Sequence, residues 1–424
     1  MTTLDTALLK QNSIFDKNNF YTKKNENLSL NFPVLENLVR PRLKIAIVTE
    51  TWPPEINGVA LSLLQLCKGL QAKGHKILLV RPEQKKSCNE FTPNKECLVR
   101  AQSIPKYSHL QFGWPQISKL SEAVEDFTPD IIHVVTEGPL GFVALRVAKA
   151  KNIPISSGFH SSFQDFSRFF DLAFLLKPIQ RYLRWFHNHT NVTCVPSTDT
   201  EKALKEFGVT CPLVVVGRGV DTHKFSPEYR SQELRQSWGA GENTRVLISV
   251  GRLSPEKEVD VIIKAFSKMN EVLGHRTKLV IVGDGPDRKR LEKMSLGLDV
   301  TFTGSLSGKK LAEAYASADV FAFPSQVETF GNVVLEAMAS GLPVIAYDYA
   351  CANLHVLNEQ MGWLSPLGNE KRLIDLIRKM PSRIELEKIG KKARSSVENV
   401  GWKYPVQQFE QALYQVVEEI KMTS

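Results

Sequence analysis

The stretch that decides the fold runs from residue 44 to residue 82 and reads KIAIVTETWPPEINGVALSLLQLCKGLQAKGHKILLVRP. It begins with a short β-branched run, Lys44–Glu50, which is typical of a strand. A loop containing Pro and Gly follows, then an apolar helical pattern, SLLQLCKGLQAKGH, and then a second strand pattern, KILLVRP. A strand, a helix and a strand in this order predict a βαβ unit, in which the two strands are parallel.

The same alternation of strand and helix patterns continues along the chain in two sets. Their apolar runs are nearly continuous, as a sheet buried on both faces requires. Two such sets are too many for one doubly wound sheet, so we predict an α/β protein with two Rossmann-like domains. The further strands of the first set are Asp130–Thr136, Pro154–His160, Val192–Ser197 and Leu213–Gly217. Those of the second set are Val246–Arg252, Leu279–Gly285, Val300–Gly304, Val320–Ser325 and Pro343–Asp348.

The composition along the chain suggests where the domains begin and end. Residues 1–41 are polar and rich in Asn and Lys, which predicts a poorly ordered arm. We expect one domain over 42–225 and a second over 226–400, joined in the charged stretch between Asp221 and Asn243. Residues 401–424 predict an amphipathic helix that crosses back to the first domain, with an apolar face made by Phe409, Leu413, Val416, Val417 and Ile420.

Length and composition restrict the class of protein. The 424 residues are 42% hydrophobic and 23% charged, which is typical of a globular protein with two domains. No apolar run reaches the ~18 residues of a spanning helix, and the start lacks a signal-peptide pattern, so we expect a cytoplasmic protein. The six cysteines stand singly, with no C-x-x-C pair of a zinc site.

The formal charge of +9 predicts attraction to polyanions. Nucleic acid, anionic lipid and a diphosphate substrate all fit this charge. The sequence contains no helix-turn-helix pattern, zinc-finger spacing or aromatic-plus-basic RNA motif, so we expect no nucleic-acid partner.

The segment most informative about chemistry is ETFGNVVLEAMASGLP, residues 328–343, directly after a predicted strand. If Gly331–Ala339 is helical, Glu328 lies in the loop at its N-terminus and Glu336 about two turns after Glu328. Phe330, Gly331 and Asn332 then offer backbone N–H groups at the positive helix end, which suits sugar hydroxyls or phosphate. Taken alone, two Glu at this spacing also fit a helix-end charge and a solvated face.

This segment resembles the E-x7-E motif of retaining glycosyltransferases of the GT-B fold, most closely family four. Three further segments match the same family in the same order, and the resemblance extends from about Lys44 to Tyr414. They are PPEINGVALSL (53–63), VGRLSPEKEVDVIIKAF (250–266) and IVGDGPDRKRLE (281–292). The resemblance implies two Rossmann-like domains facing each other across a cleft, with the acceptor bound by the first and the nucleotide sugar by the second.

For the donor, the resemblance makes Arg252 and Lys257 a cationic pair that clamps the diphosphate. Two fixed cations neutralise the charge that grows on the leaving nucleotide. The chain has no D-x-D motif, which agrees with a reaction that needs no metal and no cofactor. The alternative for Arg252 is a surface ion pair with Glu256 or Glu258.

The resemblance also assigns the remaining donor contacts. Glu336 binds the ribose hydroxyls, and Glu328 binds hydroxyls of the transferred sugar, with Thr329, Phe330, Gly331 and Asn332 beside it. Gly58 lets backbone approach the phosphate, unless it is an ordinary turn glycine after Asn57. Asp284 and Gly285 border the base, unless they form a simple turn.

On the acceptor side, His160 matches a family histidine near the sugar and the acceptor. It either donates to the 6-hydroxyl of the sugar or helps to position the acceptor, and with Glu328, Arg252 and Lys257 it completes the expected catalytic set. Glu137, after the strand Asp130–Thr136, is a second candidate for acceptor contact. His133 within that strand is expected in the core.

An aromatic and basic segment follows His160. Arg181, Arg184, Trp185 and His187 come after five phenylalanines: Phe163, Phe166, Phe169, Phe170 and Phe174. Aromatics beside cations suit a helix at a lipid headgroup surface, and Lys85 with Lys86 extends a basic rim. An amphipathic helix packed on the first sheet is the alternative. The run F-H-S-S-F also looks like the branch of the family that glycosylates lipids, including mannosyl- and sulfoquinovosyl-transferases.

We therefore predict a retaining hexosyltransferase that uses a nucleotide sugar, with GDP-mannose as the first candidate donor and a lipid-linked or glycan acceptor. It is expected in the cytoplasm, at the inner face of the cytoplasmic membrane if the anionic surface is a partner. The alternatives are a glycolipid synthase using UDP-glucose, UDP-glucuronate or UDP-sulfoquinovose, and a non-catalytic nucleotide-sugar binder. A nucleotide-sugar 2-epimerase would need acid/base carboxylates in the cleft, and the sequence shows none. No G-x-G-x-x-G motif follows the first strand, which argues against a dehydrogenase.

Overall fold

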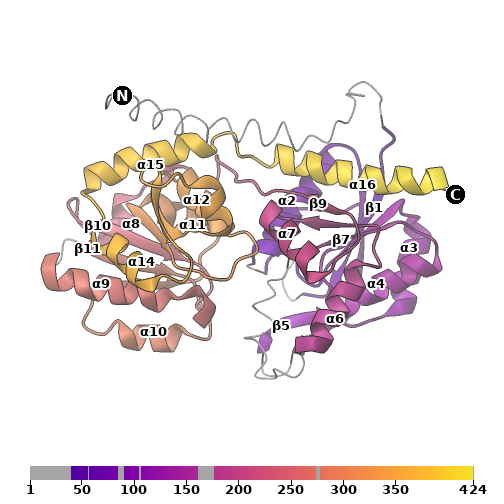
Figure 1. Cartoon of the computed structure of the whole chain (residues 1–424), viewed down its shortest axis with the longest axis horizontal. Coiled ribbons are helices and arrows are strands. Elements are labelled where there is room, and N and C mark those ends of the chain that lie inside the picture. The colour runs from indigo at the N-terminus through magenta and orange to yellow at the C-terminus, as the bar shows by residue number, and fades with distance from the viewer. Residues whose placement is uncertain are drawn as a thin grey trace, which may run out of the picture. The chain divides into compact units, whose positions relative to one another are not determined.

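The computed structural model describes residues 40–55, 57–84, 90–104, 107–160, 176–273 and 277–423 (Figure 1). The predicted arm, residues 1–41, therefore lies almost wholly outside the described residues. So do Lys85, Lys86 and the five phenylalanines of the aromatic segment. None of the helices within the described ranges combines the length and apolar character that a membrane-spanning helix needs.

The first sheet has seven strands, all parallel, in the order β3-β2-β1-β6-β7-β8-β9. The helices that accompany it are α2 (Gly58–Ala72), α3 (Ile117–Phe127), α4 (Pro139–Ala150), α6 (Leu176–His187) and α7 (Thr198–Phe207). Its strands are β1 (Lys44–Val48), β2 (Lys76–Pro82), β3 (Lys95–Val99), β6 (Ile131–Val134), β7 (Ile155–Gly158), β8 (Val192–Val195) and β9 (Leu213–Val215). A separate antiparallel hairpin pairs β4 (Ala101–Ile104) with β5 (Tyr107–Gly113).

The second sheet has six parallel strands in the order β12-β11-β10-β13-β14-β15. Its strands are β10 (Arg245–Val250), β11 (Thr277–Val282), β12 (Val300–Gly304), β13 (Val320–Phe323), β14 (Val344–Tyr347) and β15 (Gly362–Ser365). Its helices are α8 (Gln232–Ser237), α9 (Val259–Leu273), α10 (Arg288–Met294), α11 (Gly308–Ala316), α12 (Asn332–Ala339), α13 (Ala350–His355), α14 (Glu370–Arg378) and α15 (Arg383–Val397).

These two sheets confirm the predicted α/β class and the two Rossmann-like halves. Every strand predicted from an apolar run is present. Most of them, such as β1, β6, β10 and β13, are inner strands with buried residues, whereas β9 and β12 are partly buried edge strands. The strands that the sequence did not reveal are β3, β4, β5 and β15. Of these, β3 and β15 are edge strands that are only partly buried, so they lack a continuous apolar run.

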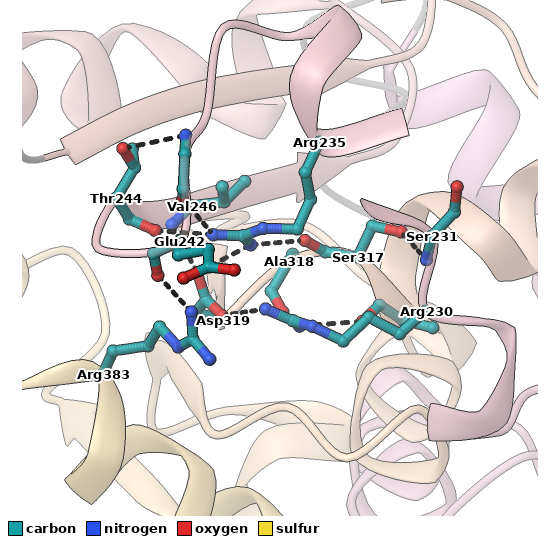
Figure 2. Close-up of polar contacts among 12 residues, drawn as sticks. Arg230, Ser231, Arg235, Glu242, Thr244, Val246, Ser317, Ala318, Asp319 and Arg383 are labelled. Atoms are coloured by element: carbon teal, nitrogen blue, oxygen red, sulfur yellow. Dashed lines mark hydrogen bonds and ion pairs between the residues drawn. The ribbon is translucent and has the colours of Figure 1, made fainter. Parts of the chain in front are cut away.

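The polar stretch expected to join the domains is attached to the second sheet. It contains the short 3-10 helix Pro227–Tyr229 and α8. Arg230 and Arg235 both pair with Asp319, at 2.7 Å and 3.0 Å, just before β13 begins (Figure 2). The side chain of Arg235 is fully buried, and Asp319 also accepts from the backbone N–H of Val246 at 2.8 Å. This cluster fixes the start of the second half of the chain to its own sheet.

The last helix, α16 (Lys403–Thr423), packs against α2 of the first half. Phe409, Leu413, Val416 and Val417 are buried in the same core as β1 and α2, and Figure 1 shows the helix beside that sheet. The approach is close, because a Cβ added at Gly69 of α2 would lie 2.3 Å from the side chain of Val406. Helix α16 is therefore part of the core formed by β1 and α2.

Candidate functional site

In both sheets the order in which successive strands are added changes direction at one point. In the first sheet the switch lies between β1 and β6, and in the second it lies between β10 and β13. Ligands of open α/β sheets bind outside the carboxyl ends of the strands at such a point. Directly after these four strands come Glu50, Glu137, Arg252 and Glu328. Three of these four were predicted as site residues from the sequence.

Two glycine-containing loops of the second sheet touch each other. The first follows β10 and carries Arg252, and the second follows β11 and carries Asp284. A Cβ added at Gly283 would lie 1.8 Å from the backbone oxygen of Gly251, and one at Gly285 would lie 2.2 Å from that of Leu253. Since neither contact tolerates a side chain, the glycines are needed for the two loops to approach. The structure thus brings together two motifs that the sequence showed separately.

Arg252 is exposed and pairs with neither of the acidic neighbours that the sequence offered as alternatives. Glu256 instead accepts from Ser254, and Glu258 accepts from Gln326 at 2.6 Å and from Tyr347 at 3.2 Å. The guanidinium of Arg252 thus stands at the carboxyl edge of the sheet without a carboxylate partner among the described residues.

Asp284 and Gly285, the predicted border of the base, form a local turn. The backbone N–H of Gly285 donates to Oδ1 of Asp284 at 2.8 Å, and Arg288 of α10 donates to Oδ2 at 3.2 Å. Asp284 is exposed, so its carboxylate keeps contact with solvent. Asp284 and Gly285 lie beside the loop that carries Arg252, so one ligand could contact both loops.

Lys257 and Glu328 form the central ion pair of this edge. The ammonium of Lys257 donates to Oε1 of Glu328 at 2.6 Å and to the backbone oxygen of Val327 at 3.1 Å. Tyr349 donates to the backbone oxygen of Glu328 at 2.8 Å, which fixes the loop from the other side. Both charged groups are largely buried, so their attraction is stronger than that of a surface pair.

Helix α12 begins where the sequence predicted. Gly331 is its N-cap in the left-handed region, with a φ of 90°, and the first helical residue is Asn332. The first backbone N–H groups of a helix have no acceptor within it, so the end is a ready site for negatively charged or hydroxyl oxygens. Thr329 and Phe330 lie in the loop before it, and Phe330 is buried.

Asn332 links this helix end to the first half of the chain. Its Nδ2 donates to the hydroxyl of Ser62 in α2 at 3.0 Å, while its Oδ1 is buried and has no partner among the described residues. Gly58 is the first residue of α2, one turn before Ser62, and Asn57 caps the helix by accepting from Ala60 at 2.7 Å. Two helix N-termini therefore lie near each other.

Gly58 is not a turn glycine. Its backbone does not adopt the left-handed region, and a Cβ added there would meet nothing within 4 Å. The described residues therefore give no packing reason for a glycine at this position. This fits a position that a ligand approaches closely.

Glu336 is the fifth residue of α12, about two turns after Glu328, and is partly buried. The hydroxyl of Tyr315 in α11 donates to its Oε2 at 3.1 Å. Burial raises the pKa of Glu336 to about 7, and the bond from Tyr315 and the nearby charge of Lys224 oppose this rise. The carboxyl group therefore changes its charge within the physiological pH range.

At the edge of the first sheet, His160 follows β7 and contacts Arg218, which follows β9. Nη2 of Arg218 donates to Nδ1 of His160 at 3.1 Å. Burial holds the pKa of His160 well below its usual range, and the charge of Arg218 acts in the same direction. His160 is therefore a neutral imidazole at physiological pH.

Glu137 is buried, and its Oε1 lies 3.1 Å from Nε2 of His187 in α6. The other ring nitrogen of His187 lies 3.0 Å from the hydroxyl of Ser157 in β7. The prediction that His187 belongs to an exposed aromatic and basic face is therefore wrong, because this ring is fully inside the first half of the chain. His133 is buried within β6, as expected, and burial lowers its pKa to about 3.

The rest of that predicted face is exposed. Arg181, Arg184 and Trp185 project from α6 to solvent, and the ring of Trp185 lies 6.0 Å from that of Phe142 on α4. Phe142 is 37% exposed, and so is Trp185. We call these four residues the aromatic-basic face. The sequence did not reveal Phe142 as a member, because it lies in a different helix pattern.

Glu50 was also missed. It follows β1, and its carboxylate accepts from the backbone N–H of Leu140 at 2.9 Å and from that of Gly113. Burial raises its pKa to about 7. The two bonds connect the end of hairpin β4–β5 to the first turn of α4. Its place directly after the first strand was a signal that the sequence contained.

Three partners of predicted residues were likewise missed: Arg218, Tyr315 and Tyr349. Arg218 had a visible signal, since a cation in the run GRG directly follows a predicted strand. Tyr315 lies in the interior of a helical pattern, and no local pattern marks it as a partner of Glu336.

Two family models match the chain, one within each of its two halves. The model "Glycosyl transferases group 1" matches residues 230–396, and the model "Glycosyltransferase Family 4" matches residues 56–224. The two matches together include all of the site residues predicted from the sequence, from Gly58 to Glu336, but not Glu50.

Two relatives are similar over most of their length. The sulfoquinovosyl transferase SQD2 of Arabidopsis thaliana is 31% identical over 90% of this chain and 75% of its own. A GDP-mannose-dependent alpha-mannosyltransferase of Mycobacterium tuberculosis is 32% identical over 85% of this chain and 93% of its own.

The fold is also found among solved structures. A sucrose-phosphate synthase from Thermosynechococcus elongatus superposes with a TM-score of 0.74 at 21% identity. The match covers 89% of this chain and all of the other, so the arrangement of two parallel-sheet halves is shared along nearly the whole length.

Proposed function

The chain belongs to the GT-B glycosyltransferases of family four, and we propose that it transfers a hexose from a nucleotide sugar to a lipid-linked or glycan acceptor. We further propose that the reaction retains the configuration of the sugar and needs no metal ion. The observation that carries the proposal is the cluster of Arg252, Lys257, Glu328 and the α12 N-terminus at one edge of the second sheet.

The cluster fits the charge changes of this reaction. The bond from the anomeric carbon to the diphosphate breaks, and its electron pair goes to the phosphate oxygen. Arg252, Lys257 and the helix end would stabilise that charge as it develops. The acceptor oxygen then bonds to the same face of the anomeric carbon, and its proton passes to the departing phosphate.

The other donor contacts follow from the same edge. Glu328 would bind hydroxyls of the sugar while Lys257 holds its carboxylate in place. The buried Oδ1 of Asn332 would accept from another hydroxyl, and Glu336, held by Tyr315, would accept from the ribose. Gly58 leaves room for the diphosphate between two helix ends. In this division the second domain, 226–400, binds the donor, and the first, 42–225, binds the acceptor near His160 and Glu137.

The donor itself is a choice between two kinds of nucleotide sugar. GDP-mannose is our first candidate, which the mycobacterial relative supports because it is GDP-mannose-dependent. A UDP-sugar is the alternative, supported by the similarity to a sulfoquinovosyl transferase over nine-tenths of the chain.

The deciding experiment is a donor screen. Purified protein is incubated in EDTA with GDP- and UDP-sugars and a lipid extract, and the released nucleoside diphosphate is measured. We expect lipid-dependent release from one donor, lost in Glu328→Ala and Lys257→Ala and kept in Lys309→Ala, an exposed lysine of α11. Release only after a divalent ion is added would overturn metal independence.

Two readouts complete the screen. An α-product from an α-linked donor, identified by its anomeric proton coupling, supports retention, and a β-product contradicts it. If GDP or UDP raises the melting temperature but no donor and acceptor are turned over, the protein is a nucleotide-sugar binder and not a transferase.

We also propose that the aromatic-basic face rests on an anionic membrane surface, at the inner face of the cytoplasmic membrane. Two cations beside two partly exposed rings on adjoining helices suit the headgroup region. In flotation with vesicles rich in anionic lipid, Arg181→Glu/Arg184→Glu should lose binding. Leu296→Ser, which removes an exposed apolar residue of the second half, should keep it. Wild-type protein that stays in the soluble fraction would contradict this proposal.

A further inference from the structure

Arg218 is fixed in place by the backbone that follows β9. Its Nη1 donates to the backbone oxygen of Val216 at 2.9 Å and to that of Gly217 at 3.0 Å. Its Nη2 donates to Nδ1 of His160 at 3.1 Å, and the residue is only 9% exposed. The guanidinium is therefore held by two carbonyl groups and presented to one imidazole nitrogen.

This contact decides which nitrogen of His160 carries the hydrogen. A guanidinium group has five N–H donors and no acceptor. The nitrogen that it contacts must accept, so Nδ1 of His160 carries no hydrogen. In a neutral imidazole the other nitrogen then carries it, and Nε2 is a donor with no lone pair free for a proton.

We propose that Arg218 is a positioning residue that keeps His160 as the neutral Nε2–H tautomer, so that His160 serves the transfer reaction as a hydrogen-bond donor and never as a base. The tautomer follows from the contact alone, and only its catalytic consequence rests on the proposed function. An aliphatic cation at position 218 would offer the charge without this fixed planar geometry.

The groups that act on the ring all favour the same state. They are Arg218 after β9, His133 of β6 and His187 of α6, and none of them stabilises an imidazolium. The carboxylate of Glu137 contacts His187, at 3.1 Å. Burial of His160 is the largest cause, and it holds the pKa of the ring well below the usual range. The proton of the acceptor must then leave by another route, as in the transfer step proposed above.

The orientation of the ring also depends on Gly158. A Cβ added at Gly158 would lie 2.6 Å from Nε2 of His160. An alanine there must displace the ring while it leaves Arg218 untouched. This gives a second variant that disturbs the same contact from the opposite side.

The first test reads the tautomer directly. The full-length protein is labelled with ¹⁵N-histidine, and the signals of His160 are assigned by their loss in His160→Gln. We expect an unprotonated Nδ1 and a protonated Nε2 that do not change between about pH 5.5 and 8.5. In Arg218→Met the ring should titrate toward its ordinary range or show the other tautomer. A wild-type His160 with a protonated Nδ1, or one that titrates near pH 6.5, would overturn the proposal.

This measurement needs no substrate. Its failure is therefore distinct from failure of the proposed function, which the donor screen decides. If Arg218→Met does not fold, as judged by circular dichroism, Gly158→Ala and Arg218→Lys replace it. Both should alter the ¹⁵N shifts of His160, and unchanged shifts in both would contradict the proposal.

The second test uses kinetics. Arg218→Met should lower kcat for transfer by about 10- to 100-fold, as is typical for residues that orient a functional side chain. Its affinity for the free nucleoside diphosphate should stay unchanged. In a His160→Ala background the same substitution should have no further effect, since Arg218 acts through His160. Additive losses would show an independent role, and Arg372→Met, an exposed arginine of α14, is the matched control.

Discussion

At the scale of single residues, Glu336 shows how burial sets a binding property. Its carboxyl group lies at the partly buried second turn of α12 and accepts from Tyr315. Desolvation dominates the two favourable contacts, so the pKa rises to about 7. A carboxylate accepts hydrogen bonds from ribose hydroxyls, whereas its protonated form is a poorer acceptor. The charge of this residue should therefore control nucleotide affinity.

We predict that nucleoside diphosphate binds more weakly as the pH falls from 8 to 6, because Glu336 takes up a proton in this range. Titration calorimetry at several pH values measures the effect. Glu336→Gln should bind weakly and lose this component of the pH dependence. Tyr315→Phe removes a contact that favours the ionised form, so its midpoint should move to higher pH. A dependence unchanged in Glu336→Gln would assign it to another group.

The same pKa shift has a consequence for stability. The folded protein binds the proton of Glu336 more tightly than the unfolded chain does. This group therefore contributes stability below pH 4.5, and the contribution is lost as the pH rises toward 7. The ionised form of Glu336 that would bind ribose is therefore present at a pH where this group no longer contributes to the stability of the fold.

At the scale of elements, the entry into α12 depends on one glycine. Gly331 has a φ of 90°, and a Cβ there would make only ordinary contacts, at 3.4 Å from Phe323 and 3.6 Å from Glu328. The cost of a side chain is therefore backbone strain and not a clash. This cap sets the direction in which the chain enters the helix, next to Glu328.

We predict that Gly331→Ala lowers the free energy of unfolding by about 1–2 kcal/mol, the strain of a left-handed residue. It should also weaken donor binding, because the helix end shifts. Urea denaturation and calorimetry measure the two effects. Gly239→Ala, at another left-handed glycine with open space around it, should cost similar stability and leave binding unchanged.

The connection into the second half depends on a buried ion cluster (Figure 2). Arg230 and Arg235 share the two oxygens of Asp319, and Nε of Arg235 has no partner among the described residues. Removing the carboxylate would leave two cations close together, one of them fully buried. An unpaired buried cation lowers the free energy of unfolding by far more than the intact ion pair adds to it.

We expect Asp319→Ala to lower the free energy of unfolding by about 3–5 kcal/mol. Denaturation followed by the fluorescence of Trp238, which lies in the adjacent core, reports on this region. Asp375→Ala, whose exposed carboxylate lies 3.9 Å from Arg378, should change stability by less than about 0.5 kcal/mol. Equal effects of the two substitutions would show that the cluster adds nothing beyond a surface pair.

At the scale of the whole molecule, helix α16 packs into the core of the first half of the chain. Helix α16 fills the core formed by β1 and α2, and the ring of Phe409 meets that of His133 in β6 at 4.7 Å. Glu410 of the same helix bonds to Nε2 of His75 at 2.9 Å and to Lys73. The core of the first half therefore includes a helix that follows the second half in the sequence.

We predict that Phe409→Ala lowers the free energy of unfolding of the first half by about 3–5 kcal/mol, as for other buried aromatics. Because the two halves have separate cores, two transitions should appear in calorimetry, and the one that nucleotide does not stabilise should shift. Tyr404→Ala, on an exposed position of the same helix, should leave both transitions in place.

Much of this protein is encoded locally in its sequence. The inner strands are continuous apolar runs that alternate with helical patterns, so the two parallel sheets could be predicted from the sequence. Glu328, Glu336, Arg252 and Lys257 were singled out by the resemblance of their segments to the glycosyltransferase motifs. The edge strands β3 and β15 were not predicted, because their partly exposed positions give them a mixed composition.

The tertiary structure decided which residues become partners. His160 and Arg218 are 58 positions apart, and they meet because β7, β8 and β9 lie side by side in the sheet. The burial of His187, which the helical pattern left on a polar face, follows likewise from its contacts with Glu137 and Ser157. Periodicity reports the environment of one segment, whereas a hydrogen bond between distant residues depends on strand order, and only the folded sheet sets that order.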